Sequence, residues 1–315
     1  MRTIWFLLGW SLAWAGCNQP KPAAPITPPP PERTAPLVLH YHQDGIIRGD
    51  TTQKTLALLF SGDQYDDGLE VIRKTLDQYD VKGSFFFTGR FYRDVAHADV
   101  VEKLRQKGHY LGAHSDQHLR YVSSEKPDSL LVSQTEFATD VSNNYVEMAA
   151  HGITKNQARL FMPAYEQYNA ELAAWTKKLG LHLMGFTPGT RSNADYTTPE
   201  MPNYLGSVDI LAHIKAYERE DPAGLNGFLL LMHIGASPAR TDKFYTHLGE
   251  LITWLQKSGY TILPVDALLM PTSIPKPVPA NDPKTTEPAA PPKPDEATGK
   301  PEDYCPICQK LHQGS

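Results

Sequence analysis

Short apolar runs alternate with helical periodicities along most of the chain. Seven runs have the length of strands, at residues 55–60, 84–87, 110–113, 159–162, 181–186, 227–232 and 260–264. Between them apolar residues recur every three or four positions, as at Leu69, Ile72 and Leu76, which predicts amphipathic helices. Continuous apolar strands separated by helices are typical of a parallel sheet covered on both faces. We therefore predict an α/β fold, a (β/α) barrel of about seven parallel strands.

The 27 prolines divide the chain of 315 residues into parts. Residues 18–36 and 271–303 are rich in Pro and contain few large apolar side chains, so each is expected to be an extended tether. Residues 37–270 lie between the tethers and form the predicted folded domain. The last segment, residues 304–315, contains Cys305, Cys308 and His312. This spacing is compatible with half of a zinc site or with a local disulfide, and the sequence leaves both open.

The N-terminus has the pattern of a secretory signal. Arg2 is followed by an apolar stretch at residues 4–14 and by small residues before Cys17. This segment resembles a bacterial lipoprotein signal, which implies that Cys17 becomes lipidated and anchors the protein to the membrane. The expected location is the bacterial cell envelope, lipid-anchored and either periplasmic or surface-exposed. A plain cleaved signal peptide at residues 1–17 is the alternative.

Charge and hydropathy argue against a nucleic-acid partner and against a transmembrane span. The formal net charge is −5 and the chain has no basic tract, so we expect no nucleic-acid partner. No second long apolar segment suggests a transmembrane span.

Candidate ligands for a metal follow the third predicted strand. His114 and His118 are four residues apart, a spacing at which two imidazoles can bind one divalent ion. In a parallel barrel the loops after the strands share one end, so Asp63, Glu166 and His233 are expected near this pair. Asp66 and Asp67, just after the first strand, are alternatives that could equally form a turn and a helix cap.

Three motifs resemble those of the polysaccharide deacetylases of carbohydrate esterase family 4, the NodB-homology domain. They are His-Ser-x-x-His at 114–118, Gly-Ser-Phe-Phe-Phe-Thr-Gly at 83–89 and Leu-Met-His at 231–233. The resemblance implies a distorted seven-stranded barrel with a divalent metal held by Asp63, His114 and His118. Zinc is the expected metal, with cobalt or nickel as alternatives. It also implies His233 as general acid and the main-chain N–H of Tyr165 as an oxyanion donor.

The first and third motifs depart from the family. An ungapped register places Gly62 where the family has its catalytic base, and Met162 where it has an arginine. Asp63 is the first choice for the base if it engages the metal only partly, and Glu166 or Asp66 is the second. Arg191, Asp195, Glu166 and Tyr165 are expected to line the substrate pocket, and Phe91, Tyr92, Tyr121 and Trp175 are further aromatic candidates for stacking on sugar rings.

The predicted function is that of a metal-dependent carbohydrate deacetylase, a hydrolase acting on carbon–nitrogen bonds other than peptide bonds. Its substrate would be an N-acetylated or O-acetylated glycan, such as peptidoglycan or a chitin-like polymer. Two alternatives remain, a catalytically inactive metal-containing glycan-binding protein and an amidohydrolase acting on a small non-sugar amide.

Overall fold

The structure is a computed structural model that describes residues 37–270. The predicted signal peptide with Cys17, the two tethers and the segment with Cys305, Cys308 and His312 lie outside the described residues. Among the helices of residues 37–270, none combines the length and the apolar character needed to cross a bilayer.

A parallel sheet forms the centre of the fold, as the sequence predicted. Its middle strand β3 pairs in parallel with β8 on one side and with β4 on the other, and the sheet continues through β5 and β6 to β7. Strand β9 pairs with the first residues of β3. Each of the seven predicted runs overlaps one of these strands: β3 Thr55–Gly62, β4 Ser84–Phe87, β5 Tyr110–Ala113, β6 Leu160–Phe161, β7 His182–Leu183, β8 Phe228–His233 and β9 Thr261–Ile262.

A hairpin that the sequence analysis did not predict joins the two ends of the sheet. It consists of β1, His40–His42, and β2, Gly45–Arg48. Strand β2 runs antiparallel to β8, and Ile46 forms an isolated parallel bridge with Met184 beyond β7. The predicted barrel is therefore confirmed in a distorted form, in which a short antiparallel strand completes the circle.

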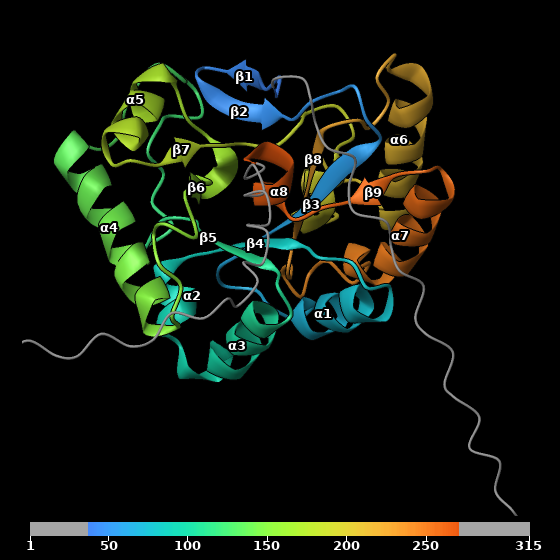
Figure 1. Ribbon diagram of the computed structural model, residues 1–315, viewed down its shortest axis with the longest axis horizontal. Coiled ribbons are helices and arrows are strands. Elements are labelled where there is room, and N and C mark those ends of the chain that lie inside the picture. The colour runs from blue at the N-terminus through green and yellow to red at the C-terminus, as the bar shows by residue number, and fades with distance from the viewer. Residues whose placement is uncertain (1–36, 271–315) are drawn as a thin grey trace, which may run out of the picture. The chain divides into compact units, whose positions relative to one another are not determined.

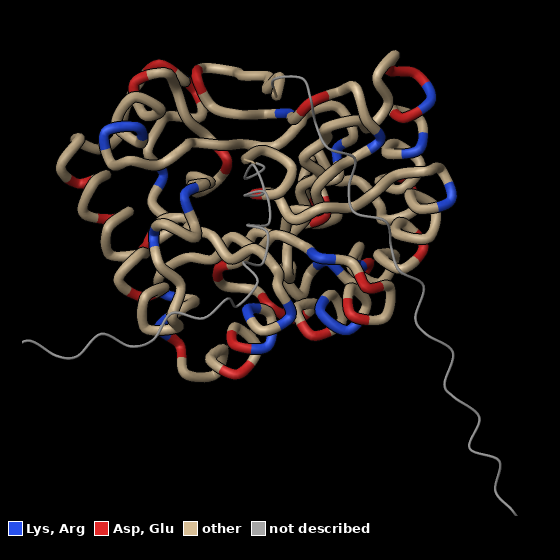
Figure 2. Tube along the Cα trace, in the orientation of Figure 1, with Lys and Arg blue, Asp and Glu red and all other residues tan. Residues whose placement is uncertain are grey.

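Helices surround the strands (Figure 1). Charged residues lie on the helices and in the loops, whereas β3 and β4 contain none (Figure 2). The α-helices are α1 Leu69–Gln78, α2 Gly89–Arg93, α3 Ala98–Gln106, α4 Gln134–Ala150, α5 Ala170–Lys178, α6 Ser207–Glu220, α7 Leu248–Lys257 and α8 Val265–Leu269. Four 3-10 helices connect them: η1 Val95–His97, η2 Ala164–Glu166, η3 Ser192–Tyr196 and η4 Phe244–His247.

The two ends of the barrel differ. Helix α8 packs on β3, and the Val265 N–H donates to Oγ of Ser84, the first residue of β4, at 2.8 Å. This contact covers the amino ends of the strands. Inside the barrel, side chains such as Phe60 and Phe85 are fully buried and stack at 5.0 Å. The loops at the carboxyl ends of the strands instead carry the ionisable side chains described below.

Candidate functional site

Loops from four parts of the chain place ionisable side chains together at the carboxyl end of the barrel. His118 Nδ1 lies 3.8 Å from an oxygen of Asp63, and His114 Nε2 lies 3.8 Å from an oxygen of Glu166. The two imidazole rings are 5.2 Å apart, measured between centroids. The structure thus brings these predicted residues together, because parallel strands have their carboxyl ends at one edge.

His114 is held with one ring nitrogen free. Its main-chain N–H donates to the Asn144 side chain at 2.8 Å, and its Nδ1 lies 3.0 Å from the Met162 carbonyl. A carbonyl at Nδ1 fixes a proton there and leaves Nε2 as an electron-pair donor. Burial is the main cause that lowers the pKa of His114 to about 3, so the ring is neutral at neutral pH.

The loop that carries His118 has a strained backbone. Ser115 and His118 have φ values of 74° and 56°, in the left-handed region that side chains other than Gly rarely adopt. Asp140 of α4 is buried beneath this loop and holds it by accepting hydrogen bonds from Ser115 Oγ at 2.7 Å, from the N–H groups of Asp116 and Gln117 at 3.0 Å each, and from the Tyr121 hydroxyl. Strain that a surrounding network maintains in this way is common at functional sites.

Asp63 has both carboxylate oxygens engaged by α2. Thr88 caps the start of α2 and donates to Asp63 at 2.9 Å, and the Arg90 guanidinium contacts both oxygens. Burial disfavours ionisation of Asp63, but the hydrogen bond from Arg90 and the nearby His118 outweigh it and lower the pKa of Asp63. Asp63 is therefore an ionised carboxylate with weak affinity for a proton.

Glu166 has the opposite character. It follows Tyr165 in η2, and both residues have left-handed backbones, with φ values of 61° and 54°. The Glu166 side chain is 11% exposed. Burial raises the pKa of Glu166 to about 7, with His233 lowering it and Asp195 adding to the rise. A carboxyl with this pKa can both release and accept a proton near neutral pH.

His233 is paired with Asp195 of η3. One Asp195 oxygen lies 2.6 Å from His233 Nδ1 and the other accepts the His233 main-chain N–H at 2.7 Å. Burial disfavours the charged ring, but the charge and hydrogen bond of Asp195 prevail and raise the pKa of His233. This is the arrangement of an imidazole that an oriented carboxylate keeps ready to hold a proton.

Tyr165 covers the mouth of this site. Its side chain is 42% exposed, with its ring 4.5 Å from that of His118 and the Arg120 guanidinium 3.9 Å above it. The other aromatic residues that we expected to stack on sugars are in the core, because their side chains point between helices and sheet: Phe91, Tyr92, Tyr121 and Trp175.

The alternative aspartates and Arg191 lie away from these groups. Asp66 contacts Nε2 of His97 at 2.9 Å, and Asp67 contacts Lys243 at 2.9 Å. Arg191 is exposed and donates to the Asn203 carbonyl at 2.7 Å. Asp195 faces His233 instead of open solvent, since its side chain is 5% exposed.

Gly62 ends β3 where the register places the base of the related family. A Cβ atom at this position would lie 2.4 Å from Ile234 Cδ1 and 2.8 Å from Phe87 Cδ1. Such distances are far shorter than any van der Waals contact. A carboxylate side chain at position 62 would therefore require Ile234 and Phe87 to move.

The sequence analysis missed three residues that shape the site. Thr88 follows a strand and precedes a helix, so its capping position was a detectable signal. Arg90 and Asp140 gave no such signal, because their partners lie 27 residues away and up to 25 residues away, respectively.

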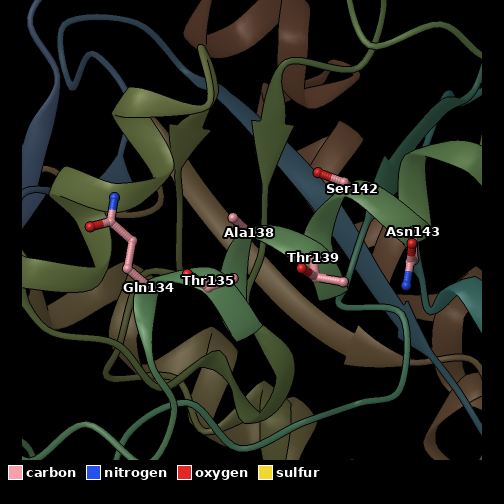
Figure 3. Close-up of a pocket in the computed structure, with 6 residues that line it drawn as sticks. All are labelled: Gln134, Thr135, Ala138, Thr139, Ser142 and Asn143. Carbon is pink, nitrogen blue, oxygen red and sulfur yellow. The ribbon is translucent and has the colours of Figure 1, made fainter.

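A surface depression over α4 is unrelated to these groups. Figure 3 shows that the labelled side chains all come from one helix: Gln134, Thr135, Ala138, Thr139, Ser142 and Asn143. None of them is charged, and the buried face of α4 with Asp140 and Asn144 points the other way. We assign no chemistry to this depression.

The residues around His114 are chemically suited to bind a divalent cation, but their side chains are not already arranged around a common point. Within residues 37–270, no group of three or more His, Cys, Asp or Glu side chains is already arranged as a metal centre, because Asp63 is turned toward Arg90. The protonation states are nevertheless those that binding requires, with lowered pKa values for both His114 and His118 and an ionised Asp63.

Comparison with known proteins points to one family. Residues 48–184 match the family model described as polysaccharide deacetylase. Over 228 residues the chain is 24% identical to peptidoglycan-N-acetylmuramic acid deacetylase PdaA of Bacillus subtilis (strain 168), covering 72% of this chain and 75% of that protein.

Solved structures share the fold. The chain superposes with a TM-score of 0.56 on BA3943 of Bacillus anthracis, described as a CE4 family pseudoenzyme, at 18% identity and with 73% of this chain and 70% of that chain covered. It also superposes on a family 4 acetyl xylan esterase from Clostridium thermocellum in complex with a cobalt ion. That match has a TM-score of 0.53 and 18% identity, with coverage of 68% and 90%. These similarities confirm the distorted barrel.

Proposed function

We propose that this chain, which contains a polysaccharide deacetylase domain, is a metal-dependent hydrolase that removes acetyl groups from a glycan. The observation that carries the proposal is the placement of Glu166 and His233 beside the histidine pair. Each has a raised pKa and each influences the charge of the other. Two groups that can exchange protons near neutral pH, next to potential metal ligands, are the parts that amide or ester hydrolysis needs.

Asp63, His114 and His118 would hold the cation. When bound, a divalent metal polarises a carbonyl oxygen and lowers the pKa of water, which is the chemistry it supplies to hydrolases. Zinc is the metal we propose, and cobalt or nickel would suit the same imidazole and carboxylate donors. With the Arg90 contact in place, Asp63 would share its charge between the cation and the guanidinium.

Glu166 is the general base in this proposal. Gly62 provides no carboxylate where the related family has its base, Asp63 has a lowered pKa, and Asp66 is directed toward His97. Glu166, with a pKa of about 7, can take a proton from an attacking water molecule. The site thus keeps a carboxylate base but supplies it from a different loop.

His233 is the general acid. Asp195 fixes its Nδ1, so Nε2 can donate a proton to the departing amine or alcohol. The Tyr165 N–H, positioned by a left-handed backbone, is the proposed donor to the oxyanion of the tetrahedral intermediate. The substrate that fits these roles is an acetylated glycan such as peptidoglycan or a chitin-like polymer.

Measuring acetate release tests the proposal. Purified full-length protein loaded with zinc should release acetate from acetylated chito-oligosaccharides or peptidoglycan fragments, and the His233→Ala variant should lose roughly 100-fold or more of this activity. Glu125→Gln is a matched control on an exposed loop. Full metal occupancy without acetate release from any glycan, ester or small amide would contradict the proposal.

A second candidate function is a catalytically inactive, metal-containing protein that binds glycan. The loss of a base position at Gly62 and the structural likeness to a pseudoenzyme favour it. Glycan binding without acetate release would identify this function. Release of acetate from a small non-sugar amide in preference to all glycans would instead identify an amidohydrolase.

We also propose that the protein is a lipid-anchored component of the bacterial cell envelope. The support is the sequence pattern ending at Cys17. Incorporation of a radiolabelled fatty acid in cells, and its loss in the Cys17→Ser variant, tests this proposal.

A further inference from the structure

Arg90 of α2 connects the segments that carry the proposed metal ligands. Its guanidinium contacts both carboxylate oxygens of Asp63, one of them from Nε at 2.5 Å. Its main-chain N–H donates at 3.1 Å to the carbonyl of Asp116, which lies in the loop between His114 and His118. A single arginine is therefore hydrogen-bonded to the segment after β3 and to the histidine loop after β5.

The start of α2 packs directly against the histidine loop. The Gly89 N–H donates to the Ser115 carbonyl at 3.0 Å, and a Cβ atom on Gly89 would lie 1.9 Å from the Asp116 carboxylate. Glycine is thus required for this close approach. The main chain of Arg90 is consequently fixed beside the site, whereas its side chain is 46% exposed and has solvent next to it.

The proposed ligands have other contacts that hold them in place. Asp63 also accepts a hydrogen bond from the Thr88 hydroxyl at 2.9 Å. The ring of His114 is oriented by the Met162 carbonyl, 3.0 Å from Nδ1. Removal of the Arg90 side chain therefore leaves these contacts intact and mainly changes the charge that an incoming cation meets.

The charge of Arg90 acts in two opposite directions. The Asp63 side chain is only 14% exposed, and a carboxylate with so little contact with water needs a compensating charge or hydrogen bonds. The guanidinium supplies both, and it stays protonated at every pH at which proteins fold. A divalent cation that binds the same carboxylate is repelled by this charge and competes with it for the two oxygens.

We propose that Arg90 is a positioning residue that sets the metal affinity of the site through Asp63. It stabilises the carboxylate when no cation is bound, and it weakens the binding of a cation by competing for the same oxygens. The inference rests on the proposed function, which assigns Asp63, His114 and His118 as the ligands. The cation is consequently exchangeable, and the occupancy of the site follows the metal concentration around the protein.

The test measures zinc affinity and needs no turnover. Competition with a chromophoric chelator gives the zinc Kd of the full-length wild type and of the Arg90→Met and Arg90→Gln variants. The His118→Ala variant reports the zinc bound elsewhere in the chain. We expect both Arg90 variants to bind zinc roughly ten- to hundredfold more tightly than the wild type. In excess chelator their melting temperatures should be lower than that of the wild type, because Asp63 loses its partner.

Arg105→Met is the matched control. Arg105 of α3 contacts both carboxylate oxygens of Glu102, at 2.8 Å and 2.7 Å, and its side chain is 45% exposed. The control therefore removes an equally exposed, doubly bonded arginine whose partner is not a proposed metal ligand. Its zinc Kd should equal that of the wild type.

The outcomes separate failure of this inference from failure of the proposed function. If zinc binding is lost in His118→Ala but the Arg90 variants bind zinc no more tightly than the wild type, the role of Arg90 is overturned and the metal site stands. Tighter binding in Arg105→Met by the same factor would also overturn it, because any lost positive charge would then suffice. If the wild type binds no more zinc than His118→Ala, the proposed metal site fails and the inference fails with it.

Discussion

Replacing Glu166 with Gln tests the central electrostatic feature of the site. Raising the pKa of a carboxyl from 4.5 to about 7 corresponds to roughly 3 kcal/mol, at about 1.4 kcal/mol for each tenfold change in proton affinity. Between these pH values the folded protein keeps a proton on Glu166 that the unfolded chain has released. Stability therefore falls as pH rises through this window, and the loss is complete above it.

The Glu166→Gln variant has no carboxyl to ionise at this position, so it does not lose this stability as the pH rises. The free energy of unfolding of the variant minus that of the wild type should therefore be about 3 kcal/mol larger at pH 8 than at pH 4. For a domain of this size, 3 kcal/mol corresponds to roughly 6–12 °C in melting temperature. The melting temperature of the variant minus that of the wild type should therefore be greater at pH 8 than at pH 4 by this amount. Thermal unfolding is measured in chelator, because a bound cation would itself lower the pKa of a neighbouring carboxyl.

The same variant also tests the proposed role in catalysis. Acetate release should fall by about 100-fold or more, and the acidic limb of the pH–rate profile of the metal-loaded wild type, expected below pH 7 because the cation lowers the pKa of Glu166, should disappear. Glu125→Gln should change neither stability nor activity. Equal stability differences between variant and wild type at pH 4 and pH 8 would refute the burial argument. An unchanged acidic limb would refute the assignment of Glu166 as base.

Three further predictions concern the other parts of the site. Asp195→Asn should lower the pKa of His233, which moves the alkaline limb of the pH–rate profile to lower pH and reduces kcat roughly 100-fold or more. A profile that does not move would show that Asp195 does not orient the general acid. Asp140→Ala removes the hydrogen-bond acceptor beneath the loop that carries His118. The free energy of unfolding, measured by denaturant titration, should fall by at least about 2 kcal/mol, and zinc affinity should fall roughly tenfold. Unchanged zinc affinity would show that Asp140 does not support the metal site. Gly62→Asp should lower the melting temperature and restore no activity to Glu166→Gln, because Ile234 fills the space; restored acetate release would show that the barrel can accept the carboxylate after all.

The site differs from that of the resembled deacetylases at two positions, and other side chains supply similar groups there. Gly62 stands where the resembled deacetylases have their base, and Met162 stands where they have an arginine. In its place Arg90 engages the remaining aspartate of the first motif, and Glu166 enters from the loop after β6. A carboxylate and an arginine are therefore still present, but each comes from a different strand end.

The sequence by itself determined the barrel and the location of its chemistry. Apolar runs bounded by polar loops identify buried parallel strands, since such strands need apolar side chains on both faces. The spacing of His114 and His118 is likewise local information. The β1–β2 hairpin escaped prediction because its strands are short, and β1 is exposed and polar.

Only the tertiary structure decided which of the candidate side chains lie together. The pairing of His233 with Asp195, separated by 38 residues, the capture of Asp63 by Arg90 and the burial of Glu166 each depend on distances between separate loops. A pKa responds to desolvation and to charges within a few ångströms, and neither quantity is encoded by neighbours in sequence. The burial of the aromatic candidates Phe91, Tyr92, Tyr121 and Trp175 was likewise decided by tertiary packing, which places all four in the hydrophobic core.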